Sequence, residues 1–167
     1  MLPMSRLRFA LLAATIMPGA LVAQAGAAVV TLVGEGGVEK ELSASELAAL
    51  PQVEVRGQGR DSSSHLYRGP TVRALMTLVG APTGRALRGP NMLLAVLAEA
   101  TDGYKVAYML AELDEQFGAT EAIPALTQDG APLPAQDGPC RIVVSGGMHH
   151  ARWIRQVERL RLVRVRP

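Results

Sequence analysis

The chain after residue 27 is broken into short apolar runs by Gly, Pro and Asp-Gly pairs, and this limits the folds that it can adopt. Residues 157–165 alternate apolar side chains with arginines, which predicts a terminal strand. Residues 92–100 and 104–110 flank Thr101-Asp-Gly103, and Asp-Gly is a strong hairpin signal. Further strands are predicted over residues 28–33, 53–55, 65–67 and 140–144.

Short helices are expected between these strands. Ser43 and Glu46 have the spacing of a capping box, which marks the start of a helix, and Pro51 ends this helix. Two more short helices are predicted, over residues 72–79 from their apolar spacing and over residues 111–117. The fold class is therefore α+β, with a mixed, mostly antiparallel sheet and short helices.

The N-terminus has the order of a secretory signal peptide. Arg6 and Arg8 precede an uncharged run at residues 9–23, and a small-x-small triplet ends at Ala25. A membrane anchor is the alternative, but the run is shorter than the roughly 20 residues that span a bilayer. We expect a signal peptide at residues 1–25, cut after Ala25 or after Ala27. One domain at residues 28–167 then follows with no membrane span, and its location is periplasmic or secreted.

Removing the signal peptide changes the charge balance. The precursor has 17 Lys and Arg against 15 Asp and Glu, and two of the arginines lie in the signal peptide. The mature chain is therefore close to neutral, which argues against nucleic acid as a partner. Arginines gather near the C-terminus, at positions 141, 152, 155, 159, 161, 164 and 166. They form either a site for an anion or an acidic partner, or a solvated strand face.

Cys140 is the sole cysteine, so the chain can form no intramolecular disulfide. Redox chemistry of the Cys-x-x-Cys type and cysteine-rich zinc sites are excluded for the same reason. Cys140 begins the apolar run Cys-Arg-Ile-Val-Val, where a small buried side chain is expected rather than a reactive thiol.

General catalytic patterns are weak in this sequence. Asp61, Ser62 to Ser64 and His65 contain the residue types of a serine hydrolase, but adjacency in sequence does not make a catalytic triad. The Gly-x-Ser-x-Gly pattern is missing. His149 and His150 are neighbours that would point to opposite faces of a strand, so a histidine metal site is not favoured. We therefore assign no catalytic residue and no metal ligand.

The run from Ser145 to Trp153 is the most distinctive stretch (Ser-Gly-Gly-Met-His-His-Ala-Arg-Trp). Its glycines allow a ligand to approach the backbone closely. Exposed amides, two imidazoles and an arginine suit an oxyanion or a phosphate. The alternative is a simple connection between strands, in which Trp153 anchors the core.

Four stretches taken in order resemble a known family. They are Tyr67-Arg-Gly-Pro-Thr-Val-Arg-Ala-Leu-Met76, Ala100-Thr-Asp-Gly-Tyr104, Pro132-Leu-Pro134 with Gly138-Pro-Cys-Arg-Ile-Val-Val144, and Arg152-Trp-Ile-Arg-Gln-Val157. In this order they resemble the oxidoreductase molybdopterin-binding domain, the fold of sulfite oxidase. The resemblance covers nearly all of the mature chain and is closest to the short, exported members.

The resemblance implies a sulfite-oxidase-type fold and a pterin site. Gly147, His149, His150 and Arg152 are the residues that would contact the cofactor, with Arg152 on its phosphate. Catalytic members of the family bind molybdenum through a cysteine in a loop after an early strand. The matching region here, residues 57–64, has no cysteine.

Two functions therefore stay open. The first is a periplasmic molybdopterin-binding oxidoreductase, with the cofactor held only by non-covalent contacts. The second is a non-catalytic binding module for a small anion, a pterin or a protein partner of a membrane redox or signalling system. The cofactor is accordingly either molybdopterin or none.

Overall fold

The computed structural model describes residues 28–59, 62–118, 120–146 and 150–166. The expected signal peptide, residues 1–25, lies outside the described residues. Among the described residues, no helix has the length and apolar character needed to cross a membrane.

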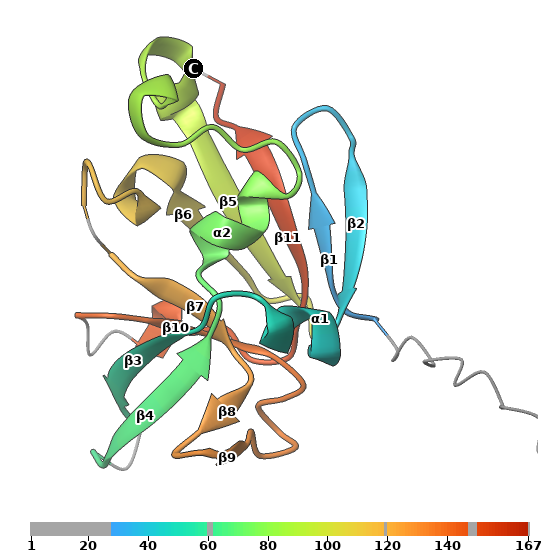
Figure 1. Ribbon diagram of the computed structural model, residues 1–167, viewed down its shortest axis with the longest axis vertical. Coiled ribbons are helices and arrows are strands. Elements are labelled where there is room, and N and C mark those ends of the chain that lie inside the picture. Colours follow the sequence, from blue (N-terminus) through green and yellow to red (C-terminus); the bar gives the residue numbers. More distant parts are fainter. Residues whose placement is uncertain (1–27, 60–61, 119, 147–149, 167) are drawn as a thin grey trace, which may run out of the picture.

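Three sheets make up the described part of the chain (Figure 1). The largest has the order β2-β1-β11-β5-β6, and β1 pairs with β11 in parallel while the other pairs in this sheet are antiparallel. Its strands are β1 (Ala28–Val33), β2 (Glu39–Ser43), β5 (Leu94–Ala100), β6 (Lys105–Met109) and β11 (Val157–Arg164). The mixed, mostly antiparallel sheet predicted from the sequence is therefore confirmed.

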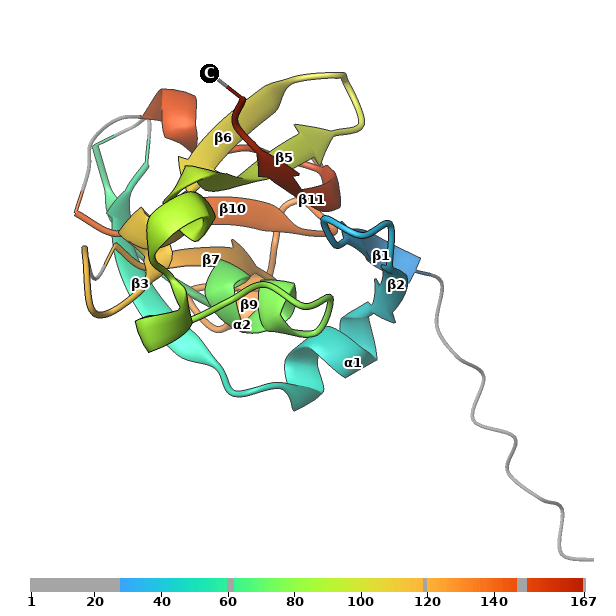
Figure 2. The same cartoon turned by 90° about the horizontal axis from the view of Figure 1, so that it is seen from above.

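The two smaller sheets lie beneath the large one in Figure 1. One has the order β3-β4-β8-β9 and the other pairs β10 with β7, all antiparallel. Their strands are β3 (Val53–Gln58), β4 (Ser64–Gly69), β7 (Ala122–Ala125), β8 (Thr127–Gln128), β9 (Ala131–Pro132) and β10 (Arg141–Val144). Seen from above, β7 and β10 lie near the centre of the molecule (Figure 2).

Two short α-helices start where the sequence places them. α1 (Ala44–Ala49) has the predicted capping box: the Glu46 amide donates to Ser43 Oγ at 3.3 Å, and the Ser43 amide donates to Glu46 Oε2 at 2.8 Å. α2 (Val72–Thr77) begins after Thr71, whose hydroxyl accepts from the Ala74 amide at 3.0 Å. Both helices bury their apolar stripe in the core.

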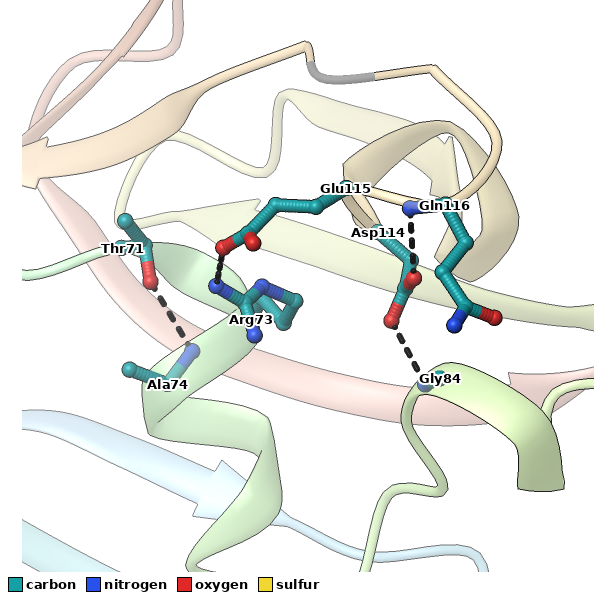
Figure 3. Close-up of polar contacts among 7 residues, drawn as sticks. All are labelled: Thr71, Arg73, Ala74, Gly84, Asp114, Glu115 and Gln116. Carbon is teal, nitrogen blue, oxygen red and sulfur yellow. Dashed lines mark hydrogen bonds and ion pairs between the residues drawn. The ribbon is translucent and has the colours of Figure 1, made fainter.

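The remaining helical segments are single 3₁₀ turns. They are η1 (Gly84–Ala86), η2 (Gly89–Leu93), η3 (Leu110–Leu113) and η4 (His150–Arg152). The helix predicted over residues 111–117 is therefore wrong beyond its first turn. Asp114 explains this, because its carboxylate accepts from the amides of Gln116, at 3.0 Å, and Gly84, at 2.9 Å (Figure 3). A side chain that bonds nearby amides competes with helical hydrogen bonds.

One hydrophobic core joins the three sheets, from Val30 in β1 to Leu162 in β11. Gly69 allows β4 to pack closely against β7, since a Cβ at this position would lie 2.2 Å from the Pro124 carbonyl oxygen. Cys140 is fully buried in this core, as expected. Trp153 is only 5% exposed and belongs to the same core, which confirms its anchoring role.

Candidate functional site

A cavity of about 360 Å³ opens between β4, β10 and η4, and we call it the first cavity. This volume falls in the range of small-ligand pockets. Its wall carries aromatic rings and cationic groups from segments far apart in the sequence. The main lining side chains are His65, Tyr67, Arg141, His150, Trp153 and Arg155.

Arg141 is held in the wall by three contacts. Its Nη1 donates to Asp137 Oδ2 at 2.8 Å, and both side chains are only 12% exposed. Its guanidinium lies 5.3 Å from the centre of the Trp153 ring and 5.8 Å from that of Tyr67. A planar cation between aromatic faces is well fixed in position. Arg141 Nε, however, is buried and has no hydrogen-bond partner in the described structure.

His150 shows the same pattern. Its ring packs edge-on against Trp153, with 5.4 Å between ring centres. Its Nδ1 is buried and has no partner among the described residues. Buried polar atoms of this kind are rare, and each calls for an explanation such as a ligand or a water molecule. Arg159 Nε and Arg161 Nε are buried and unpartnered in the same way, although neither residue lines the first cavity.

A second cavity, of about 400 Å³, is also lined by Trp153. It shares His150, Trp153 and Arg155 with the first cavity and adds Asp102 and Tyr104 from the β5–β6 hairpin. The Tyr104 hydroxyl donates to the Ala151 carbonyl at 2.7 Å, so the hairpin holds η4 in place. Arg155 is exposed and can serve a ligand in either cavity.

The arginines near the C-terminus divide into paired and unpaired groups. Four form ion pairs with carboxylates: Arg141 with Asp137, Arg152 with Glu112, Arg161 with Glu99 and Arg164 with Glu35. Arg155 has no carboxylate partner in the part of the chain that the structure describes, and it lines both cavities. Arg159 and Arg166 also have no carboxylate partner among the described residues, so four of the seven arginines are neutralised, and Arg155 is the unpaired one that lines the cavities.

Two of the four residues predicted to bind a cofactor lie within the described part of the chain. Gly147 and His149 lie outside the described residues. His150 lines both cavities. Arg152 is not in the lining of either cavity: its Nη2 donates to Glu112 Oε1 at 2.6 Å, and its guanidinium lies 5.1 Å from the centre of the Tyr108 ring. An anion that binds Arg152 must first compete with Glu112.

Sequence reasoning missed three residues of the site as ligand contacts. The sequence places Arg141 and Arg155 in the basic C-terminal run and in the family-like stretches, and His65 among hydrolase residue types, without assigning any of them to a ligand. Arg155 had a usable signal, since it lies two residues after Trp153 in the Arg-Trp-Ile-Arg stretch. Arg141 had none, because only the fold brings it under the rings of Tyr67 and Trp153.

Comparison with known proteins now adds the fold relationship. No protein-family model matches the sequence, and the search of curated proteins found no match. The chain is similar in fold to part of a solved structure. This structure is the sulfane dehydrogenase SoxCD from Paracoccus pantotrophus, with a TM-score of 0.60 and 16% sequence identity. The match covers 90% of this chain but only 44% of that one, so the present chain spans less than half of that protein's length. The likeness confirms the predicted fold class.

The cavity residues fit one part of a molybdenum–pterin cofactor and not the other. Arg141, His150 and Arg155 suit an anionic group such as a phosphate. The cysteine that binds molybdenum in the resembling family has no counterpart in this wall. Cys140 lines neither cavity, and its burial raises the pKa of its thiol to about 12, which disfavours a thiolate. No group of three His, Cys, Asp or Glu among the described residues is placed to hold a metal ion.

Proposed function

We propose that this protein is an exported member of the molybdopterin-binding oxidoreductase fold family that binds a small oxyanion-bearing ligand and lacks thiolate-bound molybdenum. The ligand occupies the first cavity. The proposal depends chiefly on one observation: two guanidinium groups, those of Arg141 and Arg155, line that cavity, and Arg155 is exposed and has no carboxylate partner among the described residues. A bound oxyanion would form charge-assisted hydrogen bonds with these guanidinium groups.

The charge of the wall supports an anion. Arg141 and Arg155 contribute two positive charges, and among the lining residues Asp137 contributes the one carboxylate. A cleft with excess positive charge and partly apolar walls concentrates anions. The rings of Tyr67 and Trp153 provide a surface for the apolar part of a small ligand.

The second candidate is a redox enzyme that holds a molybdenum pterin by non-covalent contacts alone. The likeness to a sulfane dehydrogenase favours it, whereas the buried position of Cys140 does not. In both cases we propose a periplasmic location, on the strength of the signal peptide predicted at residues 1–25. A periplasmic protein partner is compatible with both candidates.

Calorimetric titration with inorganic phosphate and with a small organic phosphate tests the binding proposal. Arg155→Ala removes an exposed guanidinium and should weaken binding roughly tenfold or more, the range for one charge-assisted hydrogen bond. Arg88→Ala is the matched control. Arg88 is exposed and lies in the segment joining α2 to β5, at the opposite end of Figure 1 from β3 and β4.

The proposal is wrong if neither phosphate binds, or if the Arg155 and Arg88 variants bind equally. Elemental analysis for molybdenum, with pterin fluorescence after oxidation, separates the two candidates. Protein purified from the periplasm of a cofactor-producing host should contain neither. Near-stoichiometric molybdenum and pterin would instead establish the redox enzyme.

A further inference from the structure

Three side chains, of which His65 lines the first cavity, form a continuous hydrogen-bonded chain. Ser63 Oγ lies 2.6 Å from His65 Nε2. His65 Nδ1 lies 2.7 Å from Asp129 Oδ2. Serine, histidine and aspartate in this order and at these distances are the arrangement that activates a nucleophilic hydroxyl.

The direction of the protons follows from Asp129. The Leu66 amide donates to Asp129 Oδ1 at 2.8 Å, and this bond, followed by the one from His65, holds the pKa of the carboxyl below its usual value. Asp129 is therefore ionised at neutral pH, and its Oδ2 accepts a hydrogen bond from the N–H group at His65 Nδ1. In the neutral imidazole, Nε2 is then the acceptor, and the Ser63 hydroxyl donates to it.

The fold fixes these residues from two distant segments. Ser63 and His65 belong to the end of the β3–β4 hairpin, and Asp129 lies in the turn between β8 and β9. Asp129 adopts a left-handed backbone conformation with φ of 51°. Its own amide donates to the Leu66 carbonyl at 2.8 Å, so Leu66 holds Asp129 through both its amide and its carbonyl. Such a support limits the movement of the carboxylate.

Asp61, the acid nearest to His65 in the sequence, lies outside the described residues. The adjacent serines Ser62 and Ser64 are exposed, whereas Ser63 is half-buried. Among the hydrogen bonds that the structure records, Ser63 is the serine of this loop that contacts the His65 ring.

We propose that Ser63 is a nucleophile for acyl transfer from small, negatively charged carboxylic esters, with His65 as its general base and Asp129 as a positioning residue. His65 lines the first cavity together with Arg141 and Arg155, which would hold the charge of the ester. This activity goes beyond ligand binding, and it requires no metal or redox cofactor.

The step balances without a further reagent except water. Ser63 Oγ attacks the ester carbonyl carbon and gives its proton to His65 Nε2. The ester C–O bond then breaks, and the departing alcohol takes that proton from His65. His65 then takes a proton from water, and the resulting hydroxide attacks the acyl carbon. The bond from that carbon to Ser63 Oγ breaks, His65 returns the proton to Ser63 Oγ, and the released carboxylic acid loses its own proton to the solvent.

Covalent labelling of the whole protein with an alkyl fluorophosphonate tests the proposal. Ser63 Oγ forms a bond to phosphorus, the P–F bond breaks, and fluoride leaves while His65 takes the proton. Intact mass and peptide mapping should place a single adduct on Ser63. His65→Gln should slow labelling by about 100-fold or more, the contribution of a general base.

Matched variants separate a reactive serine from a structural link between β4 and the β8–β9 turn. Ser62→Ala and Ser64→Ala should label at the native rate, and Ser63→Ala should not label. Asp129→Asn should slow labelling roughly tenfold or more, because an amide favours the wrong tautomer of His65. Asp129→Glu should recover part of this loss. Thermal melting shows whether each variant is folded.

The proposal is overturned if the native protein does not label, if the adduct maps to Ser62 or Ser64, or if folded His65→Gln labels at the native rate. Hydrolysis of 4-nitrophenyl hemisuccinate should also exceed that of 4-nitrophenyl acetate, and equal rates would exclude the charged ester. A negative labelling result would not affect the anion-binding proposal, because the phosphate titration tests Arg155 and not Ser63.

Discussion

Replacing Gly57 with alanine should displace Trp153 and destabilise the protein. Gly57 lies in β3, directly beneath the indole ring. A Cβ at this position would lie 2.2 Å from Trp153 Cη2 and 2.8 Å from Cζ2. Carbon atoms in contact prefer separations of about 3.5–4.0 Å, so the ring must move by roughly 1 Å or more.

The ring has little freedom to make this movement. Trp153 packs edge-on against Tyr67, with ring centres 5.6 Å apart, and lies beside the guanidinium of Arg141. Forcing extra volume into a packed core typically costs about 1–3 kcal/mol. We therefore expect Gly57→Ala to lower the free energy of unfolding by about that amount, and to disturb the wall between the two cavities.

Urea denaturation followed by tryptophan fluorescence measures both effects, because Trp153 is the sole tryptophan. The native emission should be that of a buried indole, and the variant's emission should shift toward the red. Gly36→Ala is the matched control, since its Cβ would meet nothing within 4 Å. This control should keep the emission and change the stability by less than about 1 kcal/mol. Equal stability and unchanged emission in Gly57→Ala would refute the packing argument.

Two further substitutions test other parts of the structure. Asp114→Asn keeps one acceptor oxygen and turns an NH₂ group toward the amide of Gly84 or Gln116 (Figure 3). Urea denaturation at pH 7 should show that the free energy of unfolding falls by about 1–3 kcal/mol. These amides hold the pKa of Asp114 below its usual value, so its stabilisation is complete above the unfolded pKa of about 3.9 and is lost as the pH falls through the lower folded pKa. The difference in the free energy of unfolding between the native protein and Asp114→Asn should therefore become smaller in acid. A difference that stays constant with pH would contradict this account. Cys140→Ser places a hydroxyl at a fully buried position and should cost about 1–3 kcal/mol, while native Cys140 should react with a thiol reagent only after unfolding. Rapid reaction of the folded protein would show that the thiol is accessible.

Local signals in the sequence predicted most of the secondary structure. The Ser43–Glu46 capping box, the hairpin at Asp102-Gly103 and the alternating terminal strand all appear as expected. The capping box and the hairpin turn depend on residues a few positions apart, and the alternation in the terminal strand marks the face that is buried once β11 pairs with β1 and β5. The short segment after Leu113 failed this test, because Asp114 bonds to Gly84, thirty positions away.

The sequence by itself also determined what the chain cannot use: with Cys140 alone it has no disulfide, and no cysteine where the resembling family binds molybdenum. The partners of each polar side chain were decided only by the tertiary structure. Arg152, for which a phosphate contact is predicted, pairs with Glu112, forty positions away. His65 meets Asp129 across 64 positions. Alternation along a strand shows which face a side chain occupies, but the packing of the sheets selects the groups that it meets there.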